Sequence, residues 1–287
     1  MRIELQLELA YRVEAPGADF VFNIHPAHTD CQTISTERLS LNQPIGVDVE
    51  TDARTGNRCM RLVAGPGELR VSYQATVDLR HHREDPARLP EVPIHRLPLD
   101  ALGYIYPSRY CESDKLMRMA TKQFGGMAPG YRRVEAIMAW VQQQVAFTSN
   151  TSSSSTSAVE TLLDQVGVCR DFAHLMIALC RAVNIPARFT TGTDYGADPA
   201  LGPPDFHAYV EVFLGDRWYI FDPSGTGIPM GFVRIGTGRD AADAAFATIF
   251  GGVTPITGPM VRAVAVGEGT EGFVLPHHTH LGLSTGT

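Results

Sequence analysis

Hydrophobic and polar residues alternate along the first part of the chain, which is typical of strands that bury one face. The buried face of the first strand would be formed by Ile3, Leu5, Leu7, Leu9 and Tyr11. Apolar runs at residues 20–24, 58–63 and 69–79 continue this pattern, and turn signals rich in glycine and proline separate them. Short strands with frequent turns predict a β-sandwich over residues 1–85.

The pattern changes to a helical period after residue 110. Apolar residues recur every three or four positions in residues 112–124 and 130–145, which predicts two helices. A third helix would begin near Cys169. Its buried face would be formed by Phe172, Leu175, Met176, Leu179 and Val183. Pro186 would end this helix, because proline disfavours helical backbone in the residue before it.

Residues 207–214 alternate in character again and predict a strand with one apolar face toward the core. The core face would be formed by Ala208, Val210, Val212 and Leu214. Gly215-Asp216 is a two-residue turn signal of the type II′ kind, and residues 217–222 would form the return strand. These segments together predict a β-hairpin.

The register of this hairpin would bring two polar side chains together. A two-residue turn pairs Leu214 with Arg217 and therefore places Tyr209 opposite Asp222. His207 lies two residues before Tyr209, so it becomes the diagonal neighbour of Asp222 on the same face, about 7–8 Å away at the backbone. An aspartate at this distance can fix the imidazole tautomer and favour its charged form.

The rest of the chain gives simpler patterns. Residues 187–193 and 261–266 are expected to form strands, and residues 239–250 a helix. Residues 270–287 are polar and rich in glycine, which predicts a partly ordered end. The serine- and threonine-rich residues 148–157 could form a mobile rim beside a site, or simply a solvated loop.

Cys169 stands where a loop becomes a helix, and this position suits a reactive thiol. A helix N-terminus favours the thiolate form, which is the nucleophile. An isolated free cysteine is more often a small buried residue, as we expect for Cys180 within the same helix. Because His207 and Asp222 are predicted to meet, Cys169 becomes a candidate nucleophile with a base and an orienting carboxylate.

At these residues the sequence resembles the bacterial transglutaminase-like family, a branch of the papain-like cysteine protease superfamily. The resemblance rests on motifs at residues 156–158, 167–175, 180–188, 206–212 and 221–223. It implies an α+β fold: a papain-like transglutaminase core, in which the cysteine-bearing helix packs on an antiparallel sheet, preceded by an N-terminal β-sandwich domain. It also implies that Cys169 is the nucleophile, His207 the base and Asp222 the orienter. Tyr209 departs from the tryptophan of many relatives, which would alter the pocket wall.

These patterns divide the chain into three parts. Residues 1–85 would form the β-rich N-terminal domain, and residues 108–287 the enzyme core with a C-terminal extension. Residues 86–107 carry five prolines and would be an extended linker.

Composition narrows the partners and the location. A net charge of −7 argues against a nucleic-acid partner, which usually meets a basic face. No apolar run reaches the 18 or so residues of a membrane helix, and the N-terminus lacks the apolar segment of a signal peptide. Five cysteines without close pairs favour a reducing, cytoplasmic location. The sequence carries no prediction of oligomeric state.

The family is functionally broad, so the reaction has to be chosen among alternatives. We expect acyl transfer through a Cys169 thioester, with hydrolysis of a peptide or amide bond in a peptide or protein substrate. Transamidation of protein glutamine is the first alternative, and a catalytically silent binding or scaffold protein is the second. No metal or cofactor is predicted, because His277-His278-Thr279-His280 has no further ligands at suitable spacing nearby.

Overall fold

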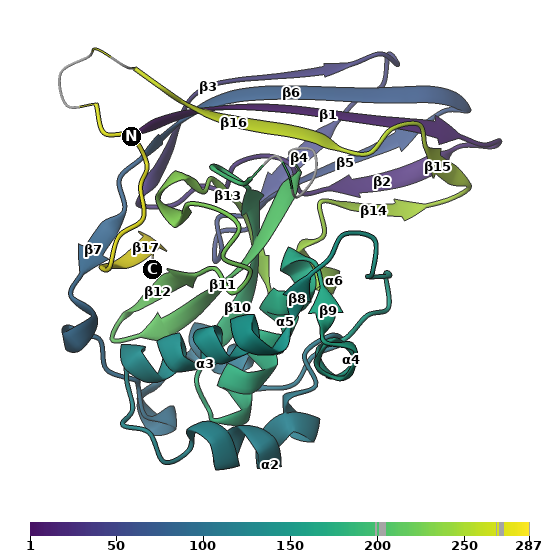
Figure 1. Ribbon diagram of the computed structural model, residues 1–287. Coiled ribbons are helices and arrows are strands. Elements are labelled where there is room, and N and C mark those ends of the chain that lie inside the picture. Colours follow the sequence, from purple (N-terminus) through teal and green to yellow (C-terminus); the bar gives the residue numbers. More distant parts are fainter. Residues whose placement is uncertain (199, 201–204, 268, 270–272, 287) are drawn as a thin grey trace.

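The computed structural model describes residues 1–198, 200, 205–267, 269 and 273–286. A β-sandwich lies at one end of the molecule and a helix-covered sheet at the other (Figure 1). The predicted α+β fold with an N-terminal β-sandwich is confirmed.

Both ends of the chain contribute strands to the sandwich. Its first sheet has the order β15-β1-β6-β3, and β16 also pairs with β1. These strands are β1 (Arg2–Val13), β3 (Gln32–Leu41), β6 (Gly67–Leu79), β15 (Val253–Pro255) and β16 (Met260–Val266). The second sheet has the order β14-β2-β5-β4. Its strands are β2 (Ala18–Phe22), β4 (Asp48–Thr51), β5 (Arg58–Ala64) and β14 (Ala247–Phe250).

The alternation of hydrophobic and polar residues in the sequence determines which side chains fill the core of the sandwich. The inward side chains of β1, from Ile3 to Leu9, are at most 3% exposed, while Glu4, Gln6 and Glu8 point to solvent. The predicted first strand is therefore confirmed, and the period-two pattern of β6 fills the same core.

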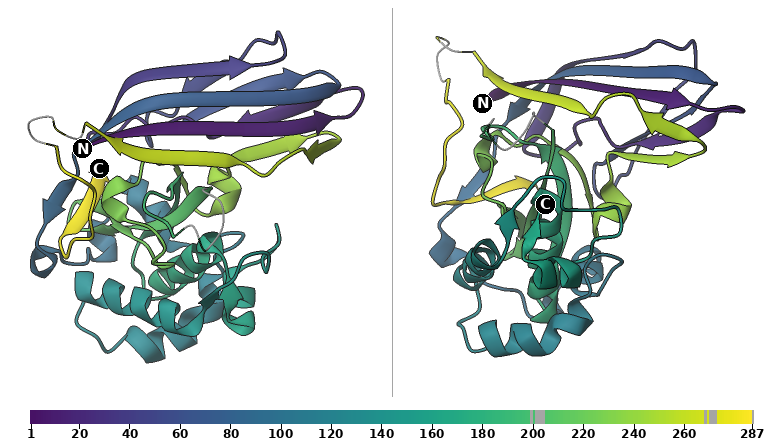
Figure 2. Two further views of the ribbon diagram at one scale, coloured as in Figure 1. Left: turned by 45° about the horizontal axis from the view of Figure 1, so that its top comes forward. Right: turned by 45° about the vertical axis from the view of Figure 1, so that its right-hand side comes forward.

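Outside the sandwich, the chain forms a six-stranded sheet of order β13-β10-β11-β12-β17-β7. Its strands are β7 (His82–Glu84), β10 (Ala187–Thr193), β11 (Phe206–Leu214), β12 (Arg217–Phe221), β13 (Arg234–Gly238) and β17 (Gly282–Gly286). The sheet lies between the sandwich and a layer of helices (Figures 1 and 2). The helices are α2 (Ser113–Phe124), α3 (Tyr131–Gln144), α4 (Ala158–Asp164) and α5 (Cys169–Ala182). A short parallel pair, β8 (Ala146–Phe147) and β9 (Val166–Gly167), precedes α5.

The central strand β11 is buried on both faces, and the prediction of a single core face was wrong. Val210 and Val212 pack with the helices in one cluster, whereas Tyr209 packs on the opposite side with Phe232 and Ile220. The sandwich and the loops above the sheet cover the face that the alternating pattern assigned to solvent.

Two local predictions also differ from the structure. Residues 86–105 form short helical turns, α1 (Leu99–Leu102) and 3₁₀ turns at Pro86–Arg88, Ile94–Arg96 and Gly103–Ile105, rather than an extended linker. Only α6 (Ala241–Ala244) is helical in the predicted helix 239–250, because pairing with β2 provides hydrogen bonds for β14. A further 3₁₀ turn is Pro229–Gly231.

The chain end is anchored rather than loose where the structure describes it. Strand β17 inserts between β12 and β7, and its residues are buried. The Thr285 hydroxyl donates a 2.5 Å hydrogen bond to Glu211 on β11. The prediction of a partly ordered end was therefore wrong for residues 282–286, while residues 270–272 and 287 lie outside the described residues.

Glu211 is the centre of a buried charge cluster that joins four strands. Its carboxylate lies 2.7 Å from Arg188 on β10 and 3.9 Å from Arg234 on β13. Burial by itself would raise the pKa of Glu211, but the two guanidinium groups hold the pKa below its usual value. The Arg188 guanidinium also stacks on Trp218, 4.1 Å from the ring centre.

We expect Glu211→Gln to lower the free energy of unfolding by about 3–5 kcal/mol, because it leaves two buried cations without their counter-charge. Urea unfolding of the variant measures this loss. Glu4→Gln, on the solvent face of β1, is the matched control and should change stability by less than about 0.5 kcal/mol. A loss below about 1 kcal/mol for Glu211→Gln would show that the cluster does not hold the strands together.

Candidate active site

Helix α5 begins at Cys169, as predicted, and a carboxylate fixes its first turn. Asp171 reaches back and accepts a 2.9 Å hydrogen bond from the backbone N–H of Val168. Gly167 is needed beside it, because a Cβ at this position would lie 2.8 Å from the Cβ of Asp171. Cys169 is therefore held at a rigid helix entry, and its thiol is partly exposed.

The hairpin forms in the predicted register, with Leu214 opposite Arg217 and Val210 opposite Phe221. This pairing brings Nε2 of His207 to 3.1 Å from Oδ1 of Asp222. Both side chains are almost fully buried, at 3% and 4% exposure. The predicted contact between these two residues is thus present.

A turn after β12 fixes the Asp222 carboxylate. The Ser224 hydroxyl donates a 2.7 Å hydrogen bond to Oδ1, and the backbone N–H of Gly227 donates to Oδ2 at 3.2 Å. Burial would raise the pKa of Asp222, but the imidazole of His207 and these donors hold the pKa below its usual value. The aspartate is therefore anionic and oriented toward the imidazole.

His207 connects Asp222 with Cys169. Because Asp222 occupies the Nε2 side of the ring, Nδ1 is the nitrogen left to interact with Cys169, which lines the same cleft as His207. Burial alone would lower the pKa of His207, but Asp222 and then Cys169 raise it to about 10. The ring also packs on Phe232, 4.8 Å between ring centres, which limits its rotation. The structure thus brings together all three residues singled out from the sequence.

Cys169 and His207 open into a cleft of about 520 Å³. Three carboxylates line it, those of Asp194, Asp198 and Asp205, and none of its described lining residues is a lysine or arginine. Burial, with the neighbouring charge of Asp194, raises the pKa of Asp205 to about 6. A thiol beside a charged imidazole in a cleft of this size has the chemistry needed for attack on a carbonyl carbon.

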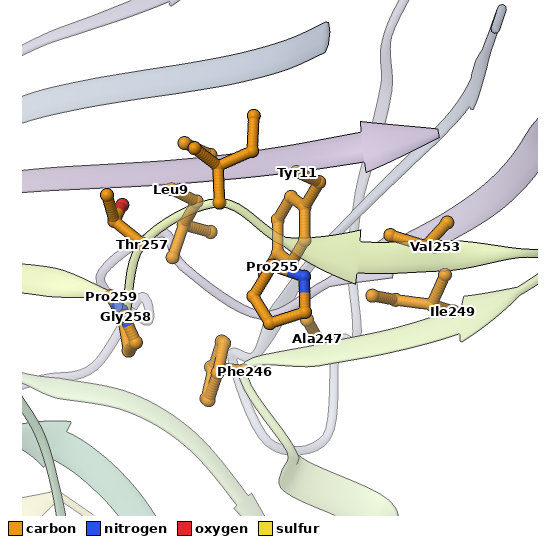
Figure 3. Close-up of a pocket in the computed structure, with 12 residues that line it drawn as sticks. Leu9, Tyr11, Phe246, Ala247, Ile249, Val253, Pro255, Thr257, Gly258 and Pro259 are labelled. Atoms are coloured by element: carbon orange, nitrogen blue, oxygen red, sulfur yellow. The ribbon is translucent and has the colours of Figure 1, made fainter. Parts of the chain in front are cut away.

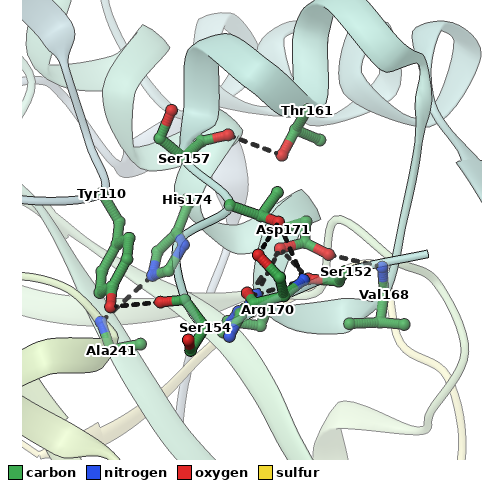
Figure 4. A network of polar contacts seen from close by, with 12 residues as sticks. Tyr110, Ser152, Ser154, Ser157, Thr161, Val168, Arg170, Asp171, His174 and Ala241 are labelled. Carbon is green, nitrogen blue, oxygen red and sulfur yellow. Dashed lines mark hydrogen bonds and ion pairs between the residues drawn. The ribbon is translucent and has the colours of Figure 1, made fainter. Parts of the chain in front are cut away.

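The serine-rich segment is tied to the start of α5 (Figure 4). The Ser152 hydroxyl donates to Asp171 at 2.9 Å, and Arg170 donates to the backbone carbonyl of Ser153 at 2.5 Å. Asp171 is completely buried, so one carboxylate holds both the helix entry and this segment. Ser149 and Asn150 line the cleft, which makes the segment a wall of the site.

Asp171 was not among the site residues chosen from the sequence, although an acid three residues after the N-cap is a capping signal. Ser224 and Gly227 were also missed, because only the folded turn shows that they face Asp222. His174 has a structural position: its Nε2 accepts a hydrogen bond from the Ala241 N–H, and burial holds its pKa well below the usual value (Figure 4).

Comparison with known proteins identifies the family of this chain. Residues 118–223 match the transglutaminase-like superfamily, and residues 1–100 match the bacterial transglutaminase N-terminal domain. A crystal structure of a candidate cysteine protease from Cytophaga hutchinsonii is 39% identical, covers 99% of this chain and 97% of that one, and superposes with a TM-score of 0.89. The chain belongs to the transglutaminase-like superfamily.

More distant relatives occur in mycobacteria. An uncharacterized protein of Mycobacterium leprae is 25% identical over 146 residues, which is 49% of this chain and 52% of that protein. One of Mycobacterium tuberculosis is 28% identical over 142 residues, 46% of this chain and 45% of that protein. The chain spans about half the length of the curated relatives it matches.

Among the described residues, no three or more His, Cys, Asp or Glu side chains are grouped so that they could hold a metal ion. No helix in the described part of the chain is long and apolar enough to cross a membrane.

The His207–Asp222 pair predicts a pH-dependent contribution to stability. Because folding raises the pKa of His207, the stabilisation from this pair is complete below pH 6.5 and is lost as the pH rises through about 10. The lowered pKa of Asp222 adds a second loss as the pH falls below 3.8. The difference in unfolding free energy between the wild type and His207→Gln should therefore be largest between these limits.

Urea unfolding across this pH range tests the expectation. His278→Gln, on an exposed segment, is the matched control for removal of an imidazole. If the unfolding free energy of the wild type exceeds that of His207→Gln by an amount that grows above pH 6.5, the assigned direction of the His207 pKa shift is contradicted.

Proposed function

We propose that this protein is a cysteine hydrolase that cleaves a peptide or amide bond in a peptide or protein substrate. The observation that carries the proposal is the arrangement of Cys169, His207 and Asp222 around one cleft. The full-length similarity to a candidate cysteine protease supports hydrolysis over the other reactions of the superfamily. Five free thiols support a cytoplasmic location.

Formation of the acyl enzyme follows from the positions of these groups. The Cys169 thiolate attacks the carbonyl carbon of the substrate, and the carbonyl π electrons move to the oxygen. The backbone N–H of Cys169 can meet this oxyanion, because it lies at the first helical position, where no intrahelical acceptor exists. The imidazolium of His207 gives its proton to the leaving nitrogen as the C–N bond breaks, and an amine departs.

The second half of the cycle releases the acid. Water attacks the thioester carbon while His207 takes a proton from it, and the C–S bond then breaks to restore the thiolate and imidazolium. Asp222 keeps the imidazole oriented through both halves. If an amine attacks in place of water, the same intermediate gives transamidation, so the two reactions differ only in the second nucleophile.

Cys169→Ala should lower hydrolysis of unfolded casein by at least about a thousandfold, because no other group can form the thioester. Cys59→Ala removes another partly buried thiol and is the matched control, for which we expect unchanged activity. Incorporation of a dansylated primary amine into casein distinguishes the outcomes. Amine incorporation without cleavage, dependent on Cys169, would replace hydrolysis by transamidation, and neither product at any casein concentration would favour a binding protein.

The imidazolium beside the sulfur predicts selective alkylation at low pH. At about pH 6 an ordinary thiol, with a pKa near 8.5, is almost wholly protonated and reacts slowly. Iodoacetamide should label Cys169 at least about tenfold faster than Cys59, whose pKa is raised by burial. Mass spectrometry of the labelled peptides measures both rates. His207→Gln should remove the difference, and equal rates in the wild type would contradict a thiolate–imidazolium pair.

A further inference from the structure

An apolar groove of about 490 Å³ opens along one side of the β-sandwich. Side chains of β1, β14 and β15, and of the segment after β15, line it (Figure 3). The principal apolar contacts come from Leu9, Tyr11, Phe246, Ile249, Val253 and Ile256. The groove has the volume of an ordinary binding pocket and can hold several aliphatic side chains.

The groove adjoins the candidate active site, and one stacked pair of aromatic rings lies between them. Phe246 lines the groove, and its ring stacks on Phe206 with 4.6 Å between ring centres and 12° between the planes. Phe206 lines the catalytic cleft and immediately precedes His207. The stacked pair therefore forms a wall that the cleft and the groove share.

Two edge strands border the groove. In the described part of the chain, β14 pairs with β2 alone and β15 pairs with β1 alone, so each strand has one side without a neighbouring strand. Such edges offer backbone N–H and C=O groups to an added extended chain. Alternate side chains of an extended chain point the same way, so they could enter the apolar groove together.

We propose that the substrate is an extended polypeptide that spans the catalytic cleft and this groove, with apolar side chains of its flanking segment seated in the groove. That Cys169 reacts with a peptide or amide bond of this polypeptide rests on the function proposed above. An extended polypeptide is favoured because a small amide bound at Cys169 would make no contact with the apolar groove or with the two strand edges beside it.

Binding of two fluorescein-labelled hexapeptides tests the proposal, one alternating Leu and Ser and the other alternating Ser and Gly. Fluorescence anisotropy should give a dissociation constant about tenfold lower for the leucine peptide, because its apolar side chains leave water. Ile256→Asp, at a groove position with 37% exposure, should abolish this preference. Val49→Asp, equally exposed on β4 at the far edge of the same sandwich, is the control and should retain it.

Equal affinities for the two peptides, or an unchanged preference in Ile256→Asp, would overturn the proposal. A second measurement connects the groove with the cleft: the leucine peptide at saturation should slow iodoacetamide labelling of Cys169 at least about threefold by covering the cleft. Peptide binding without such protection would place the groove outside the substrate path. If Cys169 labels no faster than Cys59, the proposed reaction fails, while the anisotropy data still decide whether the groove binds polypeptide.

Discussion

A sheet buried on both faces cannot leave a charged group without a partner, and this constraint determines much of the molecule. Transfer of an isolated charge into a protein interior costs roughly several kcal/mol, and the charged side chains of β11 are accordingly paired with opposite charges. Glu211 lies between two arginines in the middle of β11, and His207 meets Asp222 at the start of the same strand. The first pairing fixes how four strands assemble, and the second gives an imidazole that remains protonated near neutral pH.

The candidate nucleophile, Cys169, is held by a separate set of contacts at the other side of the cleft. Asp171 caps the first turn of α5 and also holds the serine-rich segment, so one carboxylate joins the helix entry to a wall of the cleft. The reactive groups therefore come from two rigid elements, α5 and the β11–β12 hairpin, that pack directly on each other through the apolar cluster beneath them. Rigid support of this kind is what acyl-transfer chemistry requires of its nucleophile and base.

The sandwich has a part in the site that its sequence did not suggest. Strands from residues 247–266 return to the N-terminal sheets, and the short segment between β13 and β14 places Phe246 against Phe206. These returning strands belong to the sandwich, which covers the face of the six-stranded sheet opposite the helices. The sandwich, with these returning strands, thus covers the six-stranded sheet and supplies apolar surface next to the candidate active site.

The sequence by itself determined the local elements and singled out the three candidate catalytic residues. The period of the apolar positions predicted β1, α5 and the hairpin, and a two-residue turn fixed the register that joins His207 to Asp222, because each of these depends only on neighbouring residues. Tertiary structure decided which polar faces are buried, that residues 247–250 form a strand rather than a helix, and that β17 completes the core sheet. These outcomes depend on partners more than a hundred residues away for β14 and more than sixty for β17, and no local pattern of residues records such a partner.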